Sequence, residues 1–285
     1  MNQRYLVIDV AKCHDCNNCF MACKDEHVDN DWPGYTAAQP RHGHRWVNIE
    51  RRERGQYSRN DVAYLPMTCQ HCQETPCMQD GSGAVSRRAD GIVMIDMEKA
   101  KGNKELAKSC PYGAIYWNEE IGVAQKCTMC AHLLDDKEWK PGLPRCVHSC
   151  PTGAMKYYNM EPAEFEKLAK EEGLAAYRAE LGTKPNVLYK NLHKYTKNFI
   201  AAGVLVNEDC FENATVTLKK GTAVLATRKT NFFGDFKFDG LENGEYVVEV
   251  SAAGKEASTK VQIDNESKNL GFIKLTSSLV QSPVS

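Results

Sequence analysis

Apolar and polar residues alternate with a period of two along the C-terminal part of the chain, from about residue 199 onward. This alternation is typical of strands that have one face buried and the other in water. Turn signals at Lys220-Gly221, Asn243-Gly244 and Ala253-Gly254 separate the alternating runs. The pattern predicts about seven antiparallel strands in roughly 80 residues, the size of a small β-sandwich or barrel. The alternating apolar positions are Ala214, Val216, Leu218, Phe236, Phe238, Tyr246, Val248 and Val250.

A period of 3.6 replaces this alternation in the segment 161–173. Pro162 stands near the start of the segment, where proline favours the first turn of a helix, and Gly173 is suited to end it. Phe165, Leu168 and Ala169 form an apolar stripe between the two. The pattern predicts a short amphipathic helix whose function is to pack on a core.

Length and charge narrow the class of protein. A chain of 285 residues is long for one domain and sufficient for two. Its 36 Lys and Arg residues nearly balance 37 Asp and Glu residues, so no strongly basic surface for nucleic acid is expected. We find neither a secretory signal nor a run of about 20 apolar residues. We therefore expect a cytoplasmic protein with no direct membrane contact.

Cysteine usage divides the chain into two regions. Twelve of the thirteen cysteines lie between residues 13 and 150, and only Cys210 lies beyond them. A disulfide framework requires an oxidising compartment, so cysteines in a chain without an export signal indicate metal binding. We predict a metal-binding domain over residues 1–198 and the β-domain over residues 199–285, with Cys210 as an ordinary thiol.

The first and last cysteine groups have the spacing of a protein with two 4Fe-4S clusters. In the first group the cysteines follow one another at intervals of three, three and four residues, which lets one loop hold three corners of a cubane while the fourth cysteine reaches a second cluster. The last group is its complement and ends in Cys150-Pro151. Crossed ligation, as in two-cluster ferredoxins, gives one set of Cys13, Cys16, Cys19 and Cys150 and another set of Cys23, Cys127, Cys130 and Cys146.

Four cysteines between these groups remain for a third cluster: Cys69, Cys72, Cys77 and Cys110. The twelve cysteines thus form three sets of four, which predicts three 4Fe-4S clusters and an electron-transfer function. No catalytic residue is expected in this chain.

The sequences CPYGAI at 110–115 and CPTGAM at 150–155 repeat one another. Each reads as a cysteine followed by a turn and a strand, the end of one ferredoxin half. The repeat predicts an α+β fold in which a ferredoxin-like double-repeat iron-sulfur domain precedes the antiparallel β-sandwich or barrel domain.

Two other interpretations of the metal region remain open. Cysteine pairs two residues apart also form structural zinc sites, although zinc would leave the triple spacing at 13–23 and the two Cys-Pro ends unexplained. Histidine replaces cysteine on iron in Rieske centres, but these are two-iron clusters with paired histidines. With a full set of thiols present, we expect His14, His71 and His148 to lie around the clusters or at the surface.

The arrangement of four cysteine groups resembles the electron-transfer (beta) subunits of the dimethyl sulfoxide reductase family of molybdopterin oxidoreductases. Those subunits usually carry four clusters, whereas here the second group lacks its fourth cysteine, near Gly81, and the third group lacks its first three. Both losses fall on the same cluster. Within the family the chain most resembles the small subunits of pyrogallol-phloroglucinol transhydroxylases, on the sequences DCNNCFM at 15–21, RWVNIERRERG at 45–55, AQKCTMCAHLLDD at 124–136 and TNFFGDFKF at 230–238.

The resemblance implies a heterodimer with a large catalytic subunit that holds a molybdenum bis-molybdopterin guanine dinucleotide cofactor. The large subunit would move a hydroxyl group between polyhydroxybenzenes, and this chain would supply or poise electrons, with its β-domain as a clamp or docking surface on the partner. The alternative within the family is a subunit of a reductive enzyme such as a catechol dehydroxylase. A free-standing polyferredoxin and a zinc-stabilised interaction module are alternatives from other classes.

Overall fold

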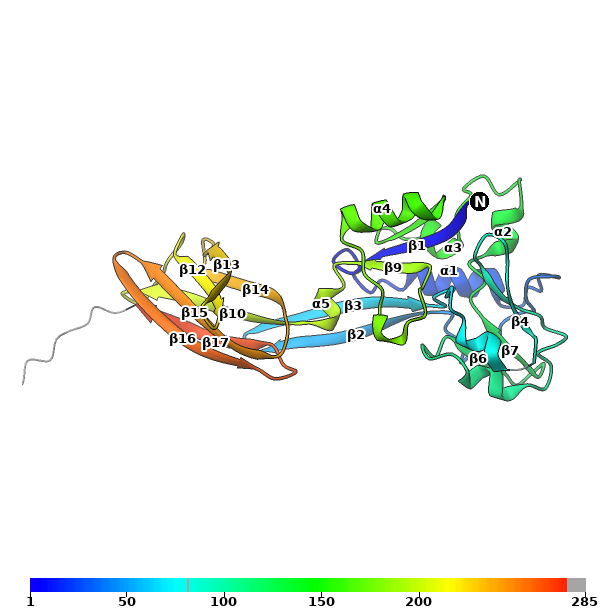
Figure 1. Ribbon diagram of the computed structural model, residues 1–285, viewed down its shortest axis with the longest axis horizontal. Helices are drawn as coiled ribbons and strands as arrows, with labels where there is room; N and C mark the ends of the chain where they lie inside the picture. Colours follow the sequence, from blue (N-terminus) through cyan, green and yellow to red (C-terminus); the bar gives the residue numbers. More distant parts are fainter. Residues whose placement is uncertain (81, 276–285) are drawn as a thin grey trace, which may run out of the picture. The chain divides into compact units, whose positions relative to one another are not determined.

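The structure is a computed structural model that describes residues 1–80 and 82–275, and these residues form two compact units (Figure 1). The first unit consists of Met1–Arg51 and Tyr64–Leu192. The second consists of Arg52–Ala63 and the chain from His193 onward. Residues 52–63, the distal part of a hairpin, thus join the C-terminal strands, an arrangement for which we found no pattern in the sequence.

A three-stranded sheet lies at one side of the first unit, with β1 (Gln3–Asp9) between β8 (Met155–Met160) and β9 (Val187–Lys190). β1 is antiparallel to β8 and parallel to β9. The predicted amphipathic helix is confirmed as α4 (Pro162–Glu172), which ends at Gly173 in the left-handed conformation. The ring of Phe165 stacks on Tyr5 with 3.7 Å between centroids, so this helix covers the sheet.

The rest of the first unit consists of the ten-residue helix α1, two short hairpins, the proximal part of the β2–β3 hairpin, and short helical elements. Cysteine-bearing loops connect them, and a small apolar core lies between them. The three hairpins pair β2 with β3, β4 with β5 and β6 with β7. The elements are α1 (Asn18–His27), β2 (Val47–Gln56), β3 (Arg59–Thr68), β4 (Val85–Arg87), β5 (Val93–Ile95), β6 (Ile115–Asn118), β7 (Val123–Lys126), α2 (Ala131–Asp135), α3 (Arg145–His148), and 3-10 turns at Pro76–Asp80, Lys104–Lys108 and Ala179–Leu181.

The two Cys-Pro segments have the same local structure. After Cys110 the chain turns, passes Gly113 with a φ of 64°, and enters β6. After Cys150 it turns, passes Gly153 with a φ of 62°, and enters β8. The predicted order of cysteine, turn and strand is therefore confirmed at both ends.

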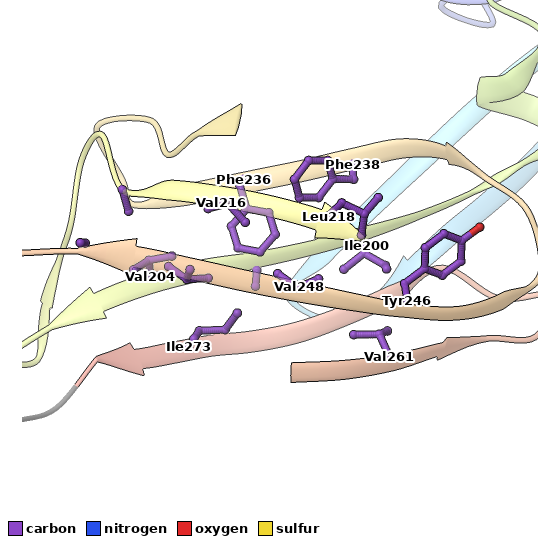
Figure 2. Packing of buried hydrophobic residues seen from close by; sticks show 14 of the residues in the cluster. Ile200, Val204, Val216, Leu218, Phe236, Phe238, Tyr246, Val248, Val261 and Ile273 are labelled. Atoms are coloured by element: carbon purple, nitrogen blue, oxygen red, sulfur yellow. The ribbon is translucent and has the colours of Figure 1, made fainter. Parts of the chain in front are cut away.

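The second unit is built from α5 (His193–Thr196) and two four-stranded sheets. In the first sheet β10 pairs with three strands, namely β11, β14 and β17. The second sheet has the order β13-β12-β15-β16. Apolar side chains of both sheets form one core, and Figure 2 shows them gathered between the strands. The strands are β10 (Asn198–Val206), β11 (Asp209–Cys210), β12 (Thr215–Lys220), β13 (Ala223–Lys229), β14 (Asp235–Leu241), β15 (Gly244–Ala252), β16 (Lys255–Ile263) and β17 (Lys268–Leu275).

The alternating pattern predicted the inward-facing residues of this unit correctly. Val216 and Leu218 on β12, and Val248 and Val250 on β15, are buried between the sheets, as expected of strands that have one buried and one solvent-exposed face. Two features differ from the expectation. The described residues contain eight strands from β10 to β17 instead of about seven, because β11 is only two residues long, and β10 pairs with β17 in parallel. Neither a two-residue strand nor the direction of a distant partner leaves a periodic signal.

Two glycines with nearly the same backbone conformation provide a test of packing in the second unit. Gly234 has a φ of 74°, and a Cβ there would lie 2.8 Å from the carbonyl oxygen of Val204. Gly254 has a φ of 72° and nothing within 4 Å of such a Cβ. We expect Gly234→Ala to lower the free energy of unfolding by about 1–3 kcal/mol more than Gly254→Ala, since both carry the strain of a positive φ and only the first creates a clash. Hydrogen exchange of the β10 and β14 amides measures this difference, and equal losses would contradict it.

Candidate metal centres

The first group of thiols lies in the loop after β1 and at the Cys150 turn. Asp15 and Asn17 have positive φ values of 56° and 59°, which let the loop turn back on itself before α1. Cys19 lies in the first turn of α1, where burial and the charges of Cys13, Cys150 and Cys16 raise its pKa to about 12. These four thiols are therefore neighbours.

The exposure of this group is uneven. Cys16 is exposed, while Cys13 and Cys150 are half-buried. Burial would raise the pKa of Cys150, but hydrogen bonds to the backbone at Met155 and nearby residues lower it overall. The first group is thus the one that opens to solvent.

The second group, Cys23, Cys127, Cys130 and Cys146, is buried. Burial and the charges of Cys127 and Cys130 raise the pKa of Cys23, and the same two charges, after burial, raise that of Cys146. Cys23 lies inside α1, one turn after Cys19. The fourth cysteine of the first run is thereby carried from the first group to the second.

Polar groups point at the sulfurs of the second group. The Met129 N–H donates to Cys127 Sγ at 3.2 Å, and Gln39 Nε2 donates to Cys23 Sγ at 3.7 Å. His27 Nε2 lies 4.0 Å from Cys130 Sγ. Donors of this kind stabilise thiolate sulfur bound to iron and influence the reduction potential.

The third group, Cys69, Cys72, Cys77 and Cys110, lines one cavity together with Val93 and Lys126. Burial, and after it the charge of Cys69, raises the pKa of Cys72 and of Cys77 to about 12. Apolar residues, among them Pro76, Val93 and Ile115, line this cavity together with the thiols.

The three groups adjoin in a row. Burial and the charges of the other three thiols in the second group raise the pKa of Cys146. The charge of Cys19, in the first group, raises it as well, so these two thiols are close together. Cys127 of the second group interacts in the same way with Cys69 of the third. The second group is therefore in the middle, an order that the sequence did not indicate.

The donor chemistry fits iron clusters. Burial, and after it the charges of neighbouring thiols, raises the pKa values of Cys19, Cys23, Cys72, Cys77, Cys127, Cys130 and Cys146. A bound positive metal core would offset this cost. Within residues 1–80 and 82–275, no three His, Cys, Asp or Glu side chains converge closely enough to hold a single metal ion.

Three of the residues around these groups carry no motif that singles them out in the sequence. His27 is buried, and burial together with the charge of His132 lowers its pKa to about 3, so it is neutral. His132 Nε2 lies 3.0 Å from Glu26 Oε1, and its ring stacks on Trp32. Lys126 is buried beside the third group. Their only sequence signal is a position within four residues of a cysteine.

The three histidines that the sequence did single out differ in environment. His14 and His148 are exposed, and His71 is fully buried between Cys69 and Cys72. Nδ1 of His71 accepts the Val93 N–H at 3.1 Å, which places the proton of the neutral ring on Nε2. Nε2 has no hydrogen-bond partner among the described residues, so an acceptor such as cluster sulfur would satisfy it.

The segment before Cys110, where the resemblance expects three further cysteines, is packed as an apolar core. Leu106 in the 3-10 turn Lys104–Lys108 is fully buried and packs with Ala100 and Val85. Gly81, near the expected position of the other missing cysteine, lies outside the described residues. No helix in the described part of the chain is long and apolar enough to cross a membrane.

Comparisons with known proteins agree with these features. Residues 60–160 match the 4Fe-4S dicluster domain, and residues 204–275 match the carboxypeptidase regulatory-like domain. The chain is 60% identical over 275 residues to the pyrogallol hydroxytransferase small subunit of Pelobacter acidigallici, covering 96% of this chain and 100% of that protein.

More distant relatives align with a smaller part of the chain. The thiosulfate reductase electron transfer subunit of Salmonella typhi is 30% identical over 199 residues, which cover 69% of this chain and 97% of that protein. An iron-sulfur subunit of the Hdr-like menaquinol oxidoreductase of Archaeoglobus fulgidus is 30% identical over 227 residues, which cover 66% of this chain and 82% of that protein.

Proposed function

Because the chain belongs to the family of iron-sulfur subunits that includes the pyrogallol hydroxytransferase small subunit, we propose that it is the electron-transfer subunit of a molybdopterin-dependent transhydroxylase. The substrates are polyhydroxybenzenes such as pyrogallol and phloroglucinol, and the hydroxyl transfer takes place on a large subunit. The observation that carries this proposal, beside the 60% identity over nearly the whole chain, is the row of three four-thiol groups.

The proposal assigns one 4Fe-4S cluster to each thiol group. Cys13, Cys16, Cys19 and Cys150 hold the first cluster, Cys23, Cys127, Cys130 and Cys146 the second, and Cys69, Cys72, Cys77 and Cys110 the third. Bound clusters of this type accept and donate single electrons. The two matching Cys-Pro segments support a ferredoxin-like double repeat as the origin of this unit.

The partner in this proposal is a large subunit with a molybdenum bis-molybdopterin guanine dinucleotide, and the two subunits form a heterodimer. This chain contributes thiols and the groups around them, and the large subunit contributes the catalytic residues. The second unit serves as a clamp or docking surface on the partner. We place the complex in the cytoplasm, where free thiols persist.

The test is metal analysis and activity of the anaerobically purified native complex. We expect close to twelve iron atoms per small chain, three clusters of four, with negligible zinc and one molybdenum per complex. The complex should convert pyrogallol to phloroglucinol without net consumption of reductant. About eight irons with one zinc would refute the third cluster, and inactivity towards polyhydroxybenzenes would refute the substrate.

A reductive enzyme such as a catechol dehydroxylase is the second candidate. The thiosulfate reductase relative favours it, because that protein is an electron transfer subunit of a reductase. The two functions differ in one measurable quantity. A reductase consumes one equivalent of two-electron donor per turnover, whereas the transhydroxylase requires none.

A further inference from the structure

Lys126 is a buried cation without an acidic partner. It is the last residue of β7, and only 3% of it is exposed. Its Nζ donates to two backbone carbonyl oxygens, that of Val93 and that of Cys127. Within the described residues, no carboxylate forms an ion pair with it. A buried ammonium group normally requires a nearby negative charge.

The groups that Lys126 faces are thiols of two metal centres. It lines the cavity of the third group. Burial raises the pKa of Cys77 and Cys110, and the positive charge of Lys126 partly opposes this increase. It has the same effect at Cys127 of the second group, where burial also raises the pKa. The ammonium group therefore lies where the negative charge of two thiolate sets would accumulate.

The backbone of one residue, Val93, connects Lys126 to His71. The carbonyl of Val93 accepts a hydrogen bond from Lys126, and the N–H of Val93 donates to His71 at 3.1 Å. Burial and the charge of Lys126 lower the pKa of His71, so the imidazole adds no second charge. Val93 itself is 1% exposed and belongs to the apolar core beside the third group. The ammonium group is thus held in a rigid position.

A fixed positive charge in a poorly solvated site favours the addition of an electron nearby. One-electron reduction of a cluster adds one negative charge, and the attraction between opposite charges is several times stronger away from water than in it. The first group, by contrast, opens to solvent through Cys16, where charges are screened.

We propose that Lys126 is the counter-charge of the third and second clusters and raises the reduction potential of the third cluster most. The first electron to enter the row then resides on the cluster held by Cys69, Cys72, Cys77 and Cys110. This inference rests on the proposed function, because it requires clusters in these thiol groups.

The test is anaerobic redox titration of the intact complex, followed by electron paramagnetic resonance, for four forms: wild type, Lys126→Gln, Lys126→Arg and Arg87→Gln. Glutamine keeps a donor for the two carbonyls and removes the charge, while arginine keeps the charge. Arg87 is the matched control, since it is exposed and its guanidinium reaches the same centre by donating to the carbonyl of Cys72 at 2.8 Å.

For Lys126→Gln we expect the equilibrium constant for reduction of one cluster to fall at least tenfold, a shift of about 59 mV towards negative potential. Lys126→Arg and Arg87→Gln should shift the reduction potential of that cluster by less than half as much. The potential of the first cluster should stay unchanged in all three variants. Loss of iron in Lys126→Gln but not in Lys126→Arg would also support the inference.

Unchanged potentials in a fully loaded Lys126→Gln complex would overturn the inference. So would equal shifts, or equal iron loss, in Lys126→Gln and Lys126→Arg, because shape and not charge would then be responsible. The iron content of the wild type tests the three-cluster proposal separately, so the two can fail independently.

Discussion

A Cys146→Ser variant is expected to lose about four of its roughly twelve iron atoms and most of the activity of the complex. Cys146 is buried in the middle thiol group and lies beside Cys19 of the first. Serine cannot offer a thiolate, and even changes in the groups around metal ligands cost about 10–100-fold in metal affinity or activity. Because the middle cluster separates the outer two, we expect the specific activity to fall more than about 100-fold.

Cys210→Ser is the matched control for this experiment. Cys210 is exposed on β11 in the second unit, outside all three thiol groups. Iron content and activity should be those of the wild type. If Cys146→Ser retained all its iron with wild-type spectra, or if Cys210→Ser lost a cluster, the assignment of ligands to the middle group would be wrong.

An Arg54→Met variant is expected to destabilise the second unit by about 3–5 kcal/mol, the usual cost of breaking a buried ion pair by removing one partner. The Arg54 side chain is 1% exposed and donates to Asp61 at 2.6 Å and to Asp239 at 2.8 Å and 3.1 Å. Burial would raise the pKa of Asp239, but the hydrogen bond and charge of Arg54 hold it below its usual range. Methionine fills a similar volume and leaves this acid without its strongest partner.

Hydrogen exchange of the β10 and β14 amides measures this loss, since the four tryptophans of the chain all lie in the first unit. Lys260→Ala is the control, because the Lys260–Glu245 pair has side-chain exposures of 77% and 64%. Exposed pairs contribute about 0–1 kcal/mol, so the control should be nearly neutral. A loss below about 1 kcal/mol in Arg54→Met would show that the buried pair does not stabilise this unit.

Local pattern was sufficient to predict much of this protein from its sequence. Alternation identified the inward-facing residues of β12 and β15 because a strand repeats every two residues, and the stripe around Phe165 identified α4 because a helix repeats every 3.6. The spacing of the first cysteine run predicted metal binding for a similar reason, since three sulfurs in one loop are a local arrangement.

Tertiary structure decided which distant residues meet, because neither periodicity nor spacing specifies contacts across long stretches of chain. It brought residues 52–63 to the C-terminal strands and set Arg54 against Asp239, which is 185 positions away in the sequence. It also ordered the thiol groups in a row and buried Lys126 beside two of them. In the sequence Lys126 is one more charged residue next to a cysteine. Only the packing of β5 and β7 removes its ammonium group from water, and burial is what makes that charge strong enough to influence electron transfer.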